Sequence, residues 1–478
     1  MKIYIQRVSL LKMVEIHPTS DAVTLHELCE GIKTIDGKNH HYCVKEIRQL
    51  LCRDTSPPIN EIVQAGVVPH LVDFLKLRDI PLLFETAWVL TNLVSETDPR
   101  STNIVVENGV IPPLMSLLHI ENEEVRNQAM WVLSNISANT GEHRDLILHA
   151  GALPAIVTMV QSVAQNPQQL DLLRLGSWTL GNLCKGKPAP PFELICPIFS
   201  CFEYILEVAD DADTIKNISW TLNELTSTHQ CRKALIKTSC LSRLLNKLEL
   251  SSSIYLDVFR ICGNLASGSD AQTTAVLNSS FLRIASETFQ QVPEDKLLKE
   301  ICFTLSNLAV TSVNEIWNYN FIKHLFSYMD KTTLKIDIKR ELMHALHKSI
   351  KNSNKNQLQV VVSTYSAIPR LCNILVAEEN DRVVVSLTLI MIEVILKFEP
   401  EYADLIERIG GFDTIESLME GGGEHSTQAT RISSRYFQTV IARRDLWKIL
   451  TAYRKHDQIL PIVLVNLILE FTYPYYTL

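Results

Sequence analysis

The sequence predicts an all-α solenoid built from stacked helical repeats of about forty residues. Three observations lead to this fold class. A tryptophan-centred motif recurs at steps of 43, 47 and 42 residues. Between its copies, Gly and Pro stand at fixed places before apolar segments of helical periodicity. Glycine is also scarce, with 16 residues in 478, which disfavours folds rich in β-turns.

The motif is Trp-x-Leu-x, and it is clearest in four copies. Their tryptophans are Trp88, Trp131, Trp178 and Trp220. The first three copies end in an asparagine four residues after the tryptophan: Asn92, Asn135 and Asn182. Weaker copies continue the register at residues 260–264, 303–307, 344–348 and 389–393, and residues 44–51 fit a partial first repeat. A period of this length is typical of the armadillo and HEAT classes of α-solenoid.

Within a repeat, a glycine precedes a short helix that carries proline in its first turn. Gly66, Gly109 and Gly151 are each followed by proline three residues later. Glycine adopts the positive φ found at helix ends, and proline in the first turn loses no helical hydrogen bond. The apolar stripes that follow cannot be buried by a single helix. Neighbouring repeats must therefore stack to form one continuous core.

A tryptophan and an asparagine four residues later lie on the same face of a helix. The asparagine amide can bond both the N–H and the C=O of an extended peptide. Successive indoles leave slots that accept the stems of Lys or Arg and attract their charges. Core packing is the alternative for a tryptophan at helical spacing, but an asparagine buried at the same place three times would be costly without partners. We therefore expect an exposed, peptide-facing surface at Trp88, Trp131 and Trp178.

These residues resemble those of the importin α (karyopherin α) family, whose members are adaptors for nuclear import. Besides the Trp/Asn motifs, the resemblance rests on residues 51–59, 182–191, 263–273 and 406–416. It implies a right-handed armadillo-repeat superhelical solenoid of about nine or ten repeats over residues 45–440. Residues 1–44 would then be a partly disordered N-terminal segment, and residues 441–478 a helical or apolar extension.

The family binds basic nuclear localisation signals at two sites. By resemblance, the major site comprises Trp88, Asn92, Ser101, Gln128, Trp131, Asn135, Asn139, Trp178, Asn182 and Trp220. The minor site comprises Arg260, Asn264, Asp270, Glu300, Phe303, Asn307 and Glu341. The resemblance implies a cargo adaptor that shuttles between cytoplasm and nucleus. The alternative is an armadillo scaffold for protein–protein contacts that has lost signal binding.

Several positions depart from the family pattern. Asn139 and Asn217 stand where acids are common, and Glu96 replaces a glycine. An amide in place of a carboxylate removes a charge-assisted hydrogen bond worth about 1.5–3 kcal/mol. At the minor site Phe303 replaces a tryptophan, and Lys348 would repel a basic ligand. We therefore expect signals with a single basic cluster to bind mainly at the major site.

Both ends of the chain also differ from the family. Residues 1–44 contain five basic residues and no basic cluster, whereas the family carries a basic arm that binds importin β. Either the adaptor is not autoinhibited and does not use importin β in the usual way, or the sequence is a truncated or alternative form. An apolar run at residues 459–469 replaces an acidic tail, which places the export receptor in question. The run is short for a membrane span and predicts a packed or partner-docking helix, with a membrane anchor as the alternative.

Composition disfavours other classes of function. The net charge of −8 disfavours direct binding of nucleic acid. The sequence has no phosphate-binding loop, nucleophile elbow or dinucleotide fingerprint, so we expect no catalysis, cofactor or metal. The 11 cysteines form no CxxC pair and no secretory signal precedes them, which indicates a reduced protein of the cytoplasm and nucleus.

Overall fold

The computed structural model describes residues 23–455, apart from 35–36, 54–56, 96–98, 292, 332, 378–380 and 424. In this part of the chain every regular element is helical. The chain divides into two units, which we call unit 1, ending at Thr221, and unit 2, beginning at Leu222. The predicted all-α armadillo solenoid is confirmed.

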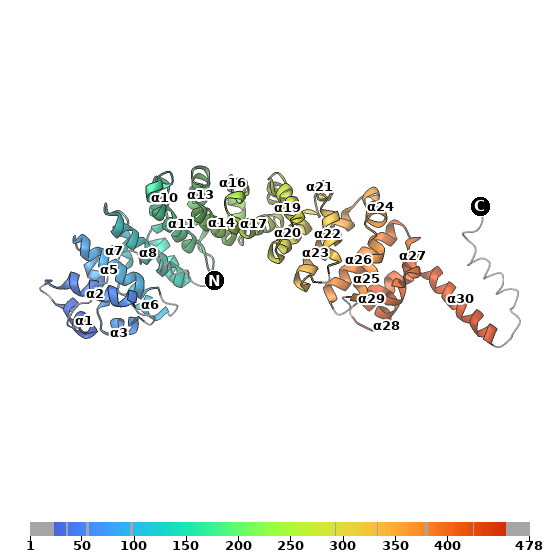
Figure 1. The fold of residues 1–478 in the computed structure, drawn as a ribbon, viewed down its shortest axis with the longest axis horizontal. Coiled ribbons are helices and arrows are strands. Elements are labelled where there is room, and N and C mark those ends of the chain that lie inside the picture. Colours follow the sequence, from blue (N-terminus) through green and yellow to red (C-terminus); the bar gives the residue numbers. More distant parts are fainter. Residues whose placement is uncertain are drawn as a thin grey trace. The chain divides into compact units, whose positions relative to one another are not determined.

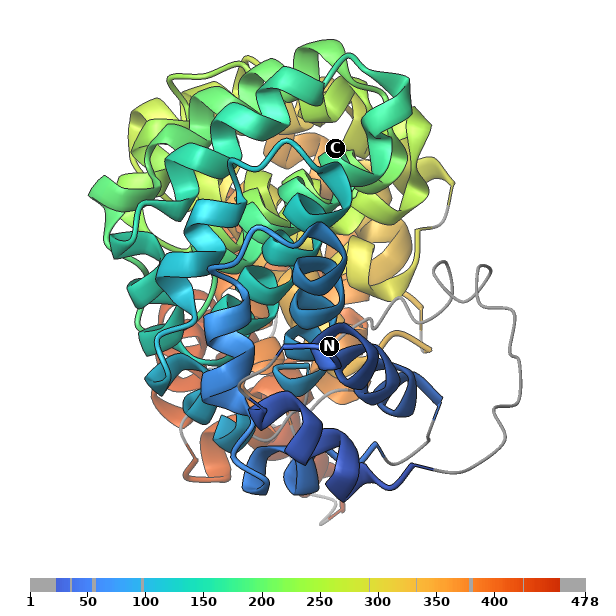
Figure 2. The same ribbon diagram turned by 90° about the vertical axis from the view of Figure 1, so that its left-hand side faces the viewer.

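Unit 1 contains α1 to α13 and the first part of α14. Their bounds are α1 Leu25–Lys33, α2 His40–Arg53, α3 Ile59–Gln64, α4 Val68–Phe74, α5 Ile80–Leu93, α6 Pro99–Glu107, α7 Ile111–Leu117, α8 Glu123–Asn139, α9 Gly141–His149, α10 Ala152–Val163, α11 Leu170–Cys184, α12 Phe192–Ile195, α13 Pro197–Val208 and α14 Ala212–Leu225. The long helices α2, α5, α8 and α11 each pack on the next. Figure 1 labels these helices in chain order, and Figure 2 shows unit 1 with its first helices, in blue, towards the reader.

Local sequence explains where these helices begin and end. Gly66, Gly109 and Gly151 have φ values of 73°, 77° and 83°, as the glycine positions predicted. Proline follows in the first turn of α4 and α7. The long helices start on polar caps: Asp79 accepts a hydrogen bond from the backbone of α5, and Asn122 does the same for α8. Such a cap stabilises a helix by about 1 kcal/mol.

Unit 2 contains the rest of α14 and α15 to α30. Their bounds are α15 His229–Leu235, α16 Cys240–Asn246, α17 Tyr255–Ala266, α18 Asp270–Leu277, α19 Phe281–Gln290, α20 Asp295–Leu308, α21 Val313–Asn318, α22 Phe321–Met329, α23 Ile336–Asn352, α24 Lys355–Ser363, α25 Ala367–Ala377, α26 Arg382–Phe398, α27 Tyr402–Arg408, α28 Gly411–Glu420, α29 Ser426–Tyr436 and α30 Gln438–Lys455. The long helices α17, α20, α23 and α26 again pack in succession.

The helices at both ends cross the boundaries expected from sequence. Helix α1 buries Leu28, Cys29 and Ile32 and packs on α2, which itself runs through residue 45. The helical array therefore begins before residue 45, while residues 1–22 lie outside the described part of the chain. Helix α30 likewise runs through residue 440, and the apolar run at 459–469 lies outside the described residues.

Among the described residues no single helix is both long and apolar enough to cross a membrane. Two bent pairs, α9 with α10 and α24 with α25, reach that length and apolarity only when the two helices are taken together.

Candidate functional site

Four tryptophans lie at the same register position of successive long helices in unit 1. Trp88 is on α5, Trp131 on α8, Trp178 on α11 and Trp220 on α14. Each of the four is partly exposed, whereas the residues directly before and after each of them in sequence are buried. Core packing alone therefore does not account for these indoles. We call the four residues the tryptophan row.

The asparagines of the motif connect neighbouring helices. The Asn135 amide nitrogen donates to the carbonyl of Thr91 at 3.3 Å, and the Asn182 amide nitrogen donates to Ser134 Oγ at 2.9 Å. Asn92 and Asn135 are partly exposed, but Asn182 is only 1% exposed. Its Oδ1 atom is buried without a hydrogen-bond partner. The structure therefore brings two of the three amides to the surface and leaves the third beneath it.

The row begins next to a cation of the chain itself. The guanidinium of Arg48, on α2, lies over the ring of Trp88, 4.5 Å from its centroid. Arg48 also forms a short ion pair with Glu85, one turn before Trp88 on α5. Both charged residues are 7% exposed. This cation was not anticipated from the motif, although Arg48 stands forty positions before Trp88 and so occupies the same register.

The row ends in a stacked pair of indoles. The rings of Trp178 and Trp220 have centroids 5.6 Å apart and an interplanar angle of 23°. The ammonium of Lys185 lies 5.9 Å from the first centroid and 5.6 Å from the second. Rings at this separation are in direct contact. The open slot expected between successive indoles is therefore absent between these two.

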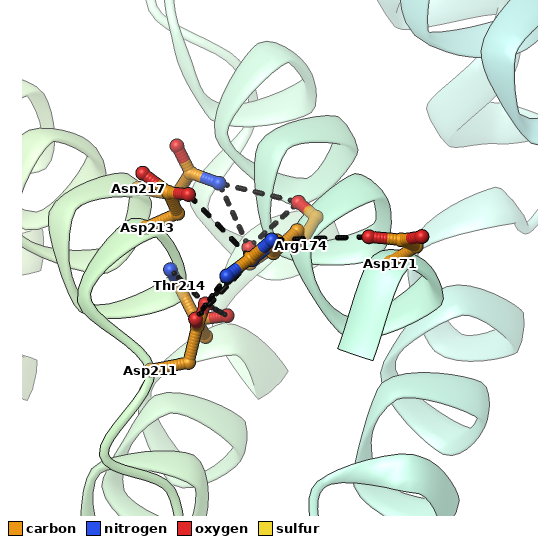
Figure 3. A network of polar contacts seen from close by, with 7 residues as sticks. Asp171, Arg174, Asp211, Asp213, Thr214 and Asn217 are labelled. Carbon is orange, nitrogen blue, oxygen red and sulfur yellow. Dashed lines mark hydrogen bonds and ion pairs between the residues drawn. The ribbon is translucent and has the colours of Figure 1, made fainter. Parts of the chain in front are cut away.

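A network of charges surrounds Arg174, one turn before Trp178 (Figure 3). Its Nη2 and Nε atoms donate to Asp211 at 2.6 and 3.0 Å. Asp213 and Asp171 approach the same guanidinium at 3.6 and 3.8 Å, and their carboxylates are largely exposed. Although burial alone would raise it, hydrogen bonds from Arg174 and Thr214 lower the pKa of Asp211. The three carboxylates outnumber the guanidinium, so this network carries a net negative charge.

Asn217 also belongs to this network, as Figure 3 shows. Its amide nitrogen donates to the carbonyl of Arg174 at 3.2 Å and to Ser177 Oγ at 3.0 Å, which ties α14 to α11. A carboxylate cannot donate to a carbonyl oxygen. The amide at this position therefore has a structural use that the sequence comparison with the family did not reveal.

Three other residues expected at the major site lie outside the register position of the tryptophan row. Ser101 and Gln128 are buried, at 5% and 6% exposure, between the packed helices. Gln128 accepts a hydrogen bond from Thr91 at 3.4 Å. Asn139, at the end of α8, is partly exposed, and its amide nitrogen lies 3.5 Å from Thr102 Oγ1. Ser101 and Gln128 are therefore not on the exposed surface of unit 1.

In unit 2, the residues expected at the minor site fall into one group and several separate positions. Arg260 on α17 pairs with Glu300 on α20 at 2.8 Å. Phe303, one turn after Glu300, lies against Gly263, where an added Cβ would stand 2.9 Å from the ring. Asn264 donates to Thr226 Oγ1 at 2.9 Å.

The other predicted residues of unit 2 lack such a connection to this group in the described structure. Asp270 is exposed in the first turn of α18, and Glu341 is partly exposed on α23. Asn307 keeps a buried amide nitrogen without a partner. On α23, burial lowers the pKa of His347 to about 4, and neither ring nitrogen has a hydrogen-bond partner. Lys348, beside it, is partly exposed, as the expected repulsion of basic ligands requires.

Comparisons with known proteins agree with this fold and register. The family model described as "Armadillo/beta-catenin-like repeat" matches residues 55–95 and 98–138. The chain is 30% identical to importin subunit alpha-1a of Oryza sativa subsp. japonica over 61% of this chain and 55% of that protein. It is 32% identical to importin subunit alpha-3 of Arabidopsis thaliana over 58% and 52%. The match thus spans about half the length of these two relatives.

Longer matches also exist. The chain is 28% identical to importin subunit alpha-5 of Arabidopsis thaliana over 89% of this chain and 83% of that protein. A solved structure of an engineered protein is 19% identical, with a TM-score of 0.72 over 85% of this chain and 97% of that one. At that identity, the structural likeness supports the fold alone.

Proposed function

The chain belongs to the importin α family, and from this premise we propose that it is a cargo adaptor for nuclear import. It holds the basic nuclear localisation signal of its cargo against the tryptophan row of unit 1. The observation that carries the proposal is the partial exposure of all four register tryptophans on successive helices. Cargo proteins with basic signals are the proposed partners. Only membership of the family supports shuttling between cytoplasm and nucleus. The same holds for the binding of importin β and of an export receptor.

The centre of the row supplies the contacts that such a signal needs. Trp131 is partly exposed and, among the described residues, has no second ring or cation against it, unlike the other three tryptophans. Its indole face can therefore receive the stem and charge of a ligand lysine. The partly exposed amides of Asn92, on the preceding long helix, and of Asn135, one turn after Trp131, can bond the ligand backbone. The exposed carboxylates of Asp171 and Asp213 attract basic residues over roughly a Debye length.

A single basic cluster bound in unit 1 is the proposed mode. In unit 2, Arg260 occupies the register position of a tryptophan and is already paired with Glu300. Phe303 offers a weaker face for a cation than an indole does. Lys348 adds a like charge to the next helix of that surface. Unit 2 should therefore add little to the affinity for a second basic cluster.

A scaffold function is the second candidate. Asn139 and Asn217 lack the charge that a carboxylate would offer to a ligand lysine, and Asn182 is buried. These features favour a protein that kept the armadillo fold for other protein–protein contacts. The partial exposure of Trp131, Asn92 and Asn135 favours signal binding instead.

Fluorescence anisotropy of a labelled peptide, Lys-rich over about five residues, tests the proposal. The wild-type chain should bind it, and Trp131→Ala/Asn135→Ala should weaken binding at least about tenfold, or 1.4 kcal/mol. Trp447→Ala is the matched control, because Trp447 is 69% exposed on α30 and far from the row in sequence. Absence of wild-type binding at tens of micromolar would favour the scaffold.

A further inference from the structure

The last part of the tryptophan row is closed by the chain's own residues. We call Trp178, Gly181, Asn182, Lys185 and Trp220 the closed subsite. The two indoles contact each other with centroids 5.6 Å apart, and the ammonium of Lys185 lies within 6 Å of both. A cation at this distance from a ring centroid is attracted by the ring quadrupole. The position where a ligand lysine would sit is thus already held by a lysine.

Glycine at position 181 makes the stacking possible. An added Cβ there would lie 2.8 Å from Cζ3 of the Trp220 ring and 2.6 Å from Thr221 Oγ1. Any larger residue would push the indole away from α11 and from Trp178. Unit 2 repeats the arrangement, since a Cβ at Gly263 would lie 2.9 Å from Phe303 and 3.0 Å from Thr304 Oγ1. A glycine three residues after the register position therefore allows the aromatic ring of the next long helix to pack directly against the backbone.

The side chain of Arg144 holds the backbone at Lys185 in place. Lys185 is the first residue after α11, and its carbonyl accepts a hydrogen bond of 2.7 Å from Arg144 Nη1. The same nitrogen donates to the carbonyl of Pro188 at 2.9 Å, and the Arg144 residue is 1% exposed. A buried guanidinium on α9 therefore fixes the backbone on both sides of the turn at Gly186. This fixes the direction in which the Lys185 side chain leaves the loop.

The burial of Asn182 fits the same closed state. This asparagine is one turn after Trp178 and is 1% exposed, whereas Asn92 and Asn135 at the equivalent positions are partly exposed. Its Oδ1 atom has no partner. An unpaired buried acceptor is costly, so a ligand that opened the subsite would regain that hydrogen bond. Three independent features, the stacked rings, the lysine and the buried amide, thus coincide in one repeat.

We propose that Lys185 is a specificity-determining residue which occupies the last aromatic subsite of the row in place of a ligand side chain. The inference rests on the proposed function and deepens it. A ligand that places a basic residue there must displace Lys185 and separate the indoles. The chain therefore reads a short basic signal centred on Trp131 and gains little from basic residues that extend beyond it.

Lys185→Met tests this proposal because it keeps the apolar stem and removes the charge. The matched control is Lys187→Met, which removes the same charge from an exposed position of the same loop. The labelled Lys-rich peptide and its single Lys→Ala versions are titrated against all three chains. Lys185→Met should bind the parent peptide about three- to tenfold more tightly than wild type, whereas Lys187→Met should change the affinity less than about twofold.

The peptide scan gives the sharper result. At least one lysine that is insensitive to alanine in wild type should become sensitive in Lys185→Met, at a cost of about threefold or more. Equal gains from both methionine variants would reduce the effect to long-range charge and overturn the proposal. The proposal would also be overturned if the same peptide lysines were sensitive to alanine in Lys185→Met and in wild type. If no chain binds any peptide, the proposed function fails, and the role of Lys185 in ligand selection fails with it.

The closed pair is tested without ligand by circular dichroism. Stacked indoles give an exciton couplet, which should vanish in Trp220→Phe and weaken in Gly181→Ala while the helical signal is retained. Trp447→Ala should leave the couplet unchanged. A wild-type spectrum identical to that of Trp220→Phe would show that the rings are not stacked, whatever the peptide affinities are.

Discussion

The guanidinium of Arg48 lies over the indole of Trp88, 4.5 Å from the ring centroid, although the two residues belong to different repeats. Arg48 stands at the register position that later repeats fill with tryptophan. The chain thus places its own cation at the first indole of the row, and Lys185 places another near the last two. The intervening Trp131 is left as the indole most open to a ligand. This arrangement limits how many basic side chains the row can receive.

Breaking the pair at the start of the row should destabilise unit 1. Arg48→Met leaves Glu85 buried and unpaired, which costs about 3–5 kcal/mol. The double variant Arg48→Met/Glu85→Gln removes both charges and should recover much of that loss. Urea denaturation followed by circular dichroism measures the difference. Lys45→Met is the control, since Lys45 is exposed on the same helix. A loss below about 1 kcal/mol for Arg48→Met would contradict the buried pair.

Arg144 should prove essential to the loop that carries Lys185. Arg144→Met leaves the carbonyls of Lys185 and Pro188 without their donor, at a cost of about 2–4 kcal/mol. In Arg144→Met, amide hydrogen exchange in the loop around Gly186 should be faster than in wild type. Exchange in α8 should change less. The control is Arg78→Met, at an exposed position of unit 1. Unchanged exchange in the loop would mean that the guanidinium does not hold it.

The repeat architecture could be predicted from sequence because it depends on local rules. The period, the positive φ of Gly66 and the helical spacing are each set within one repeat. Contacts between repeats could not be predicted in the same way. Trp220 packs against Gly181, and Asn182 is buried. Both features depend on distances between helices about forty residues apart, which the repeat period does not determine. Asn217 illustrates the same limit, because its role as a donor to α11 follows only from the packed structure.

The stability of unit 2 should fall in mild acid because of His347. Burial, followed by the nearby charges, lowers the pKa of His347 to about 4, below the ordinary value of 6.5. The unfolded chain therefore binds a proton in a pH range where the folded chain does not. Stability contributed by the neutral ring is fully present above about pH 6.5 and is lost as the pH falls towards 4.

Thermal unfolding at neutral pH and at about pH 5 checks this expectation. The drop in midpoint between the two conditions should be smaller in His347→Leu than in wild type. His229→Leu, at an exposed histidine, should show the wild-type drop. An equal drop in all three proteins would assign the acid sensitivity to other groups.

Restoring a carboxylate should have opposite consequences at the two amide positions. Asn139 makes a weak contact of 3.5 Å through its amide nitrogen, and its Oδ1 atom is buried without a partner. Asn139→Asp therefore gives up only that weak hydrogen bond, and its carboxylate lacks a partner until a ligand lysine supplies one. A carboxylate there should bind a ligand lysine by a charge-assisted hydrogen bond, and the Lys-rich peptide should bind about tenfold more tightly. Asn217 instead donates to Arg174 and Ser177, so Asn217→Asp places a carboxylate against a carbonyl oxygen. That variant should lose about 1–3 kcal/mol of stability.

Anisotropy titrations and urea denaturation of both variants separate these effects. Asn108→Asp is the control for added charge, because Asn108 is exposed in unit 1. The gain at Asn139 should exceed that of the control and should persist at raised salt, since a direct hydrogen bond is screened less than a distant charge. Equal gains for Asn139→Asp and Asn108→Asp would show that the ligand lysine does not reach residue 139. Such a result would shift the bound signal towards Trp88 and away from the end of α8.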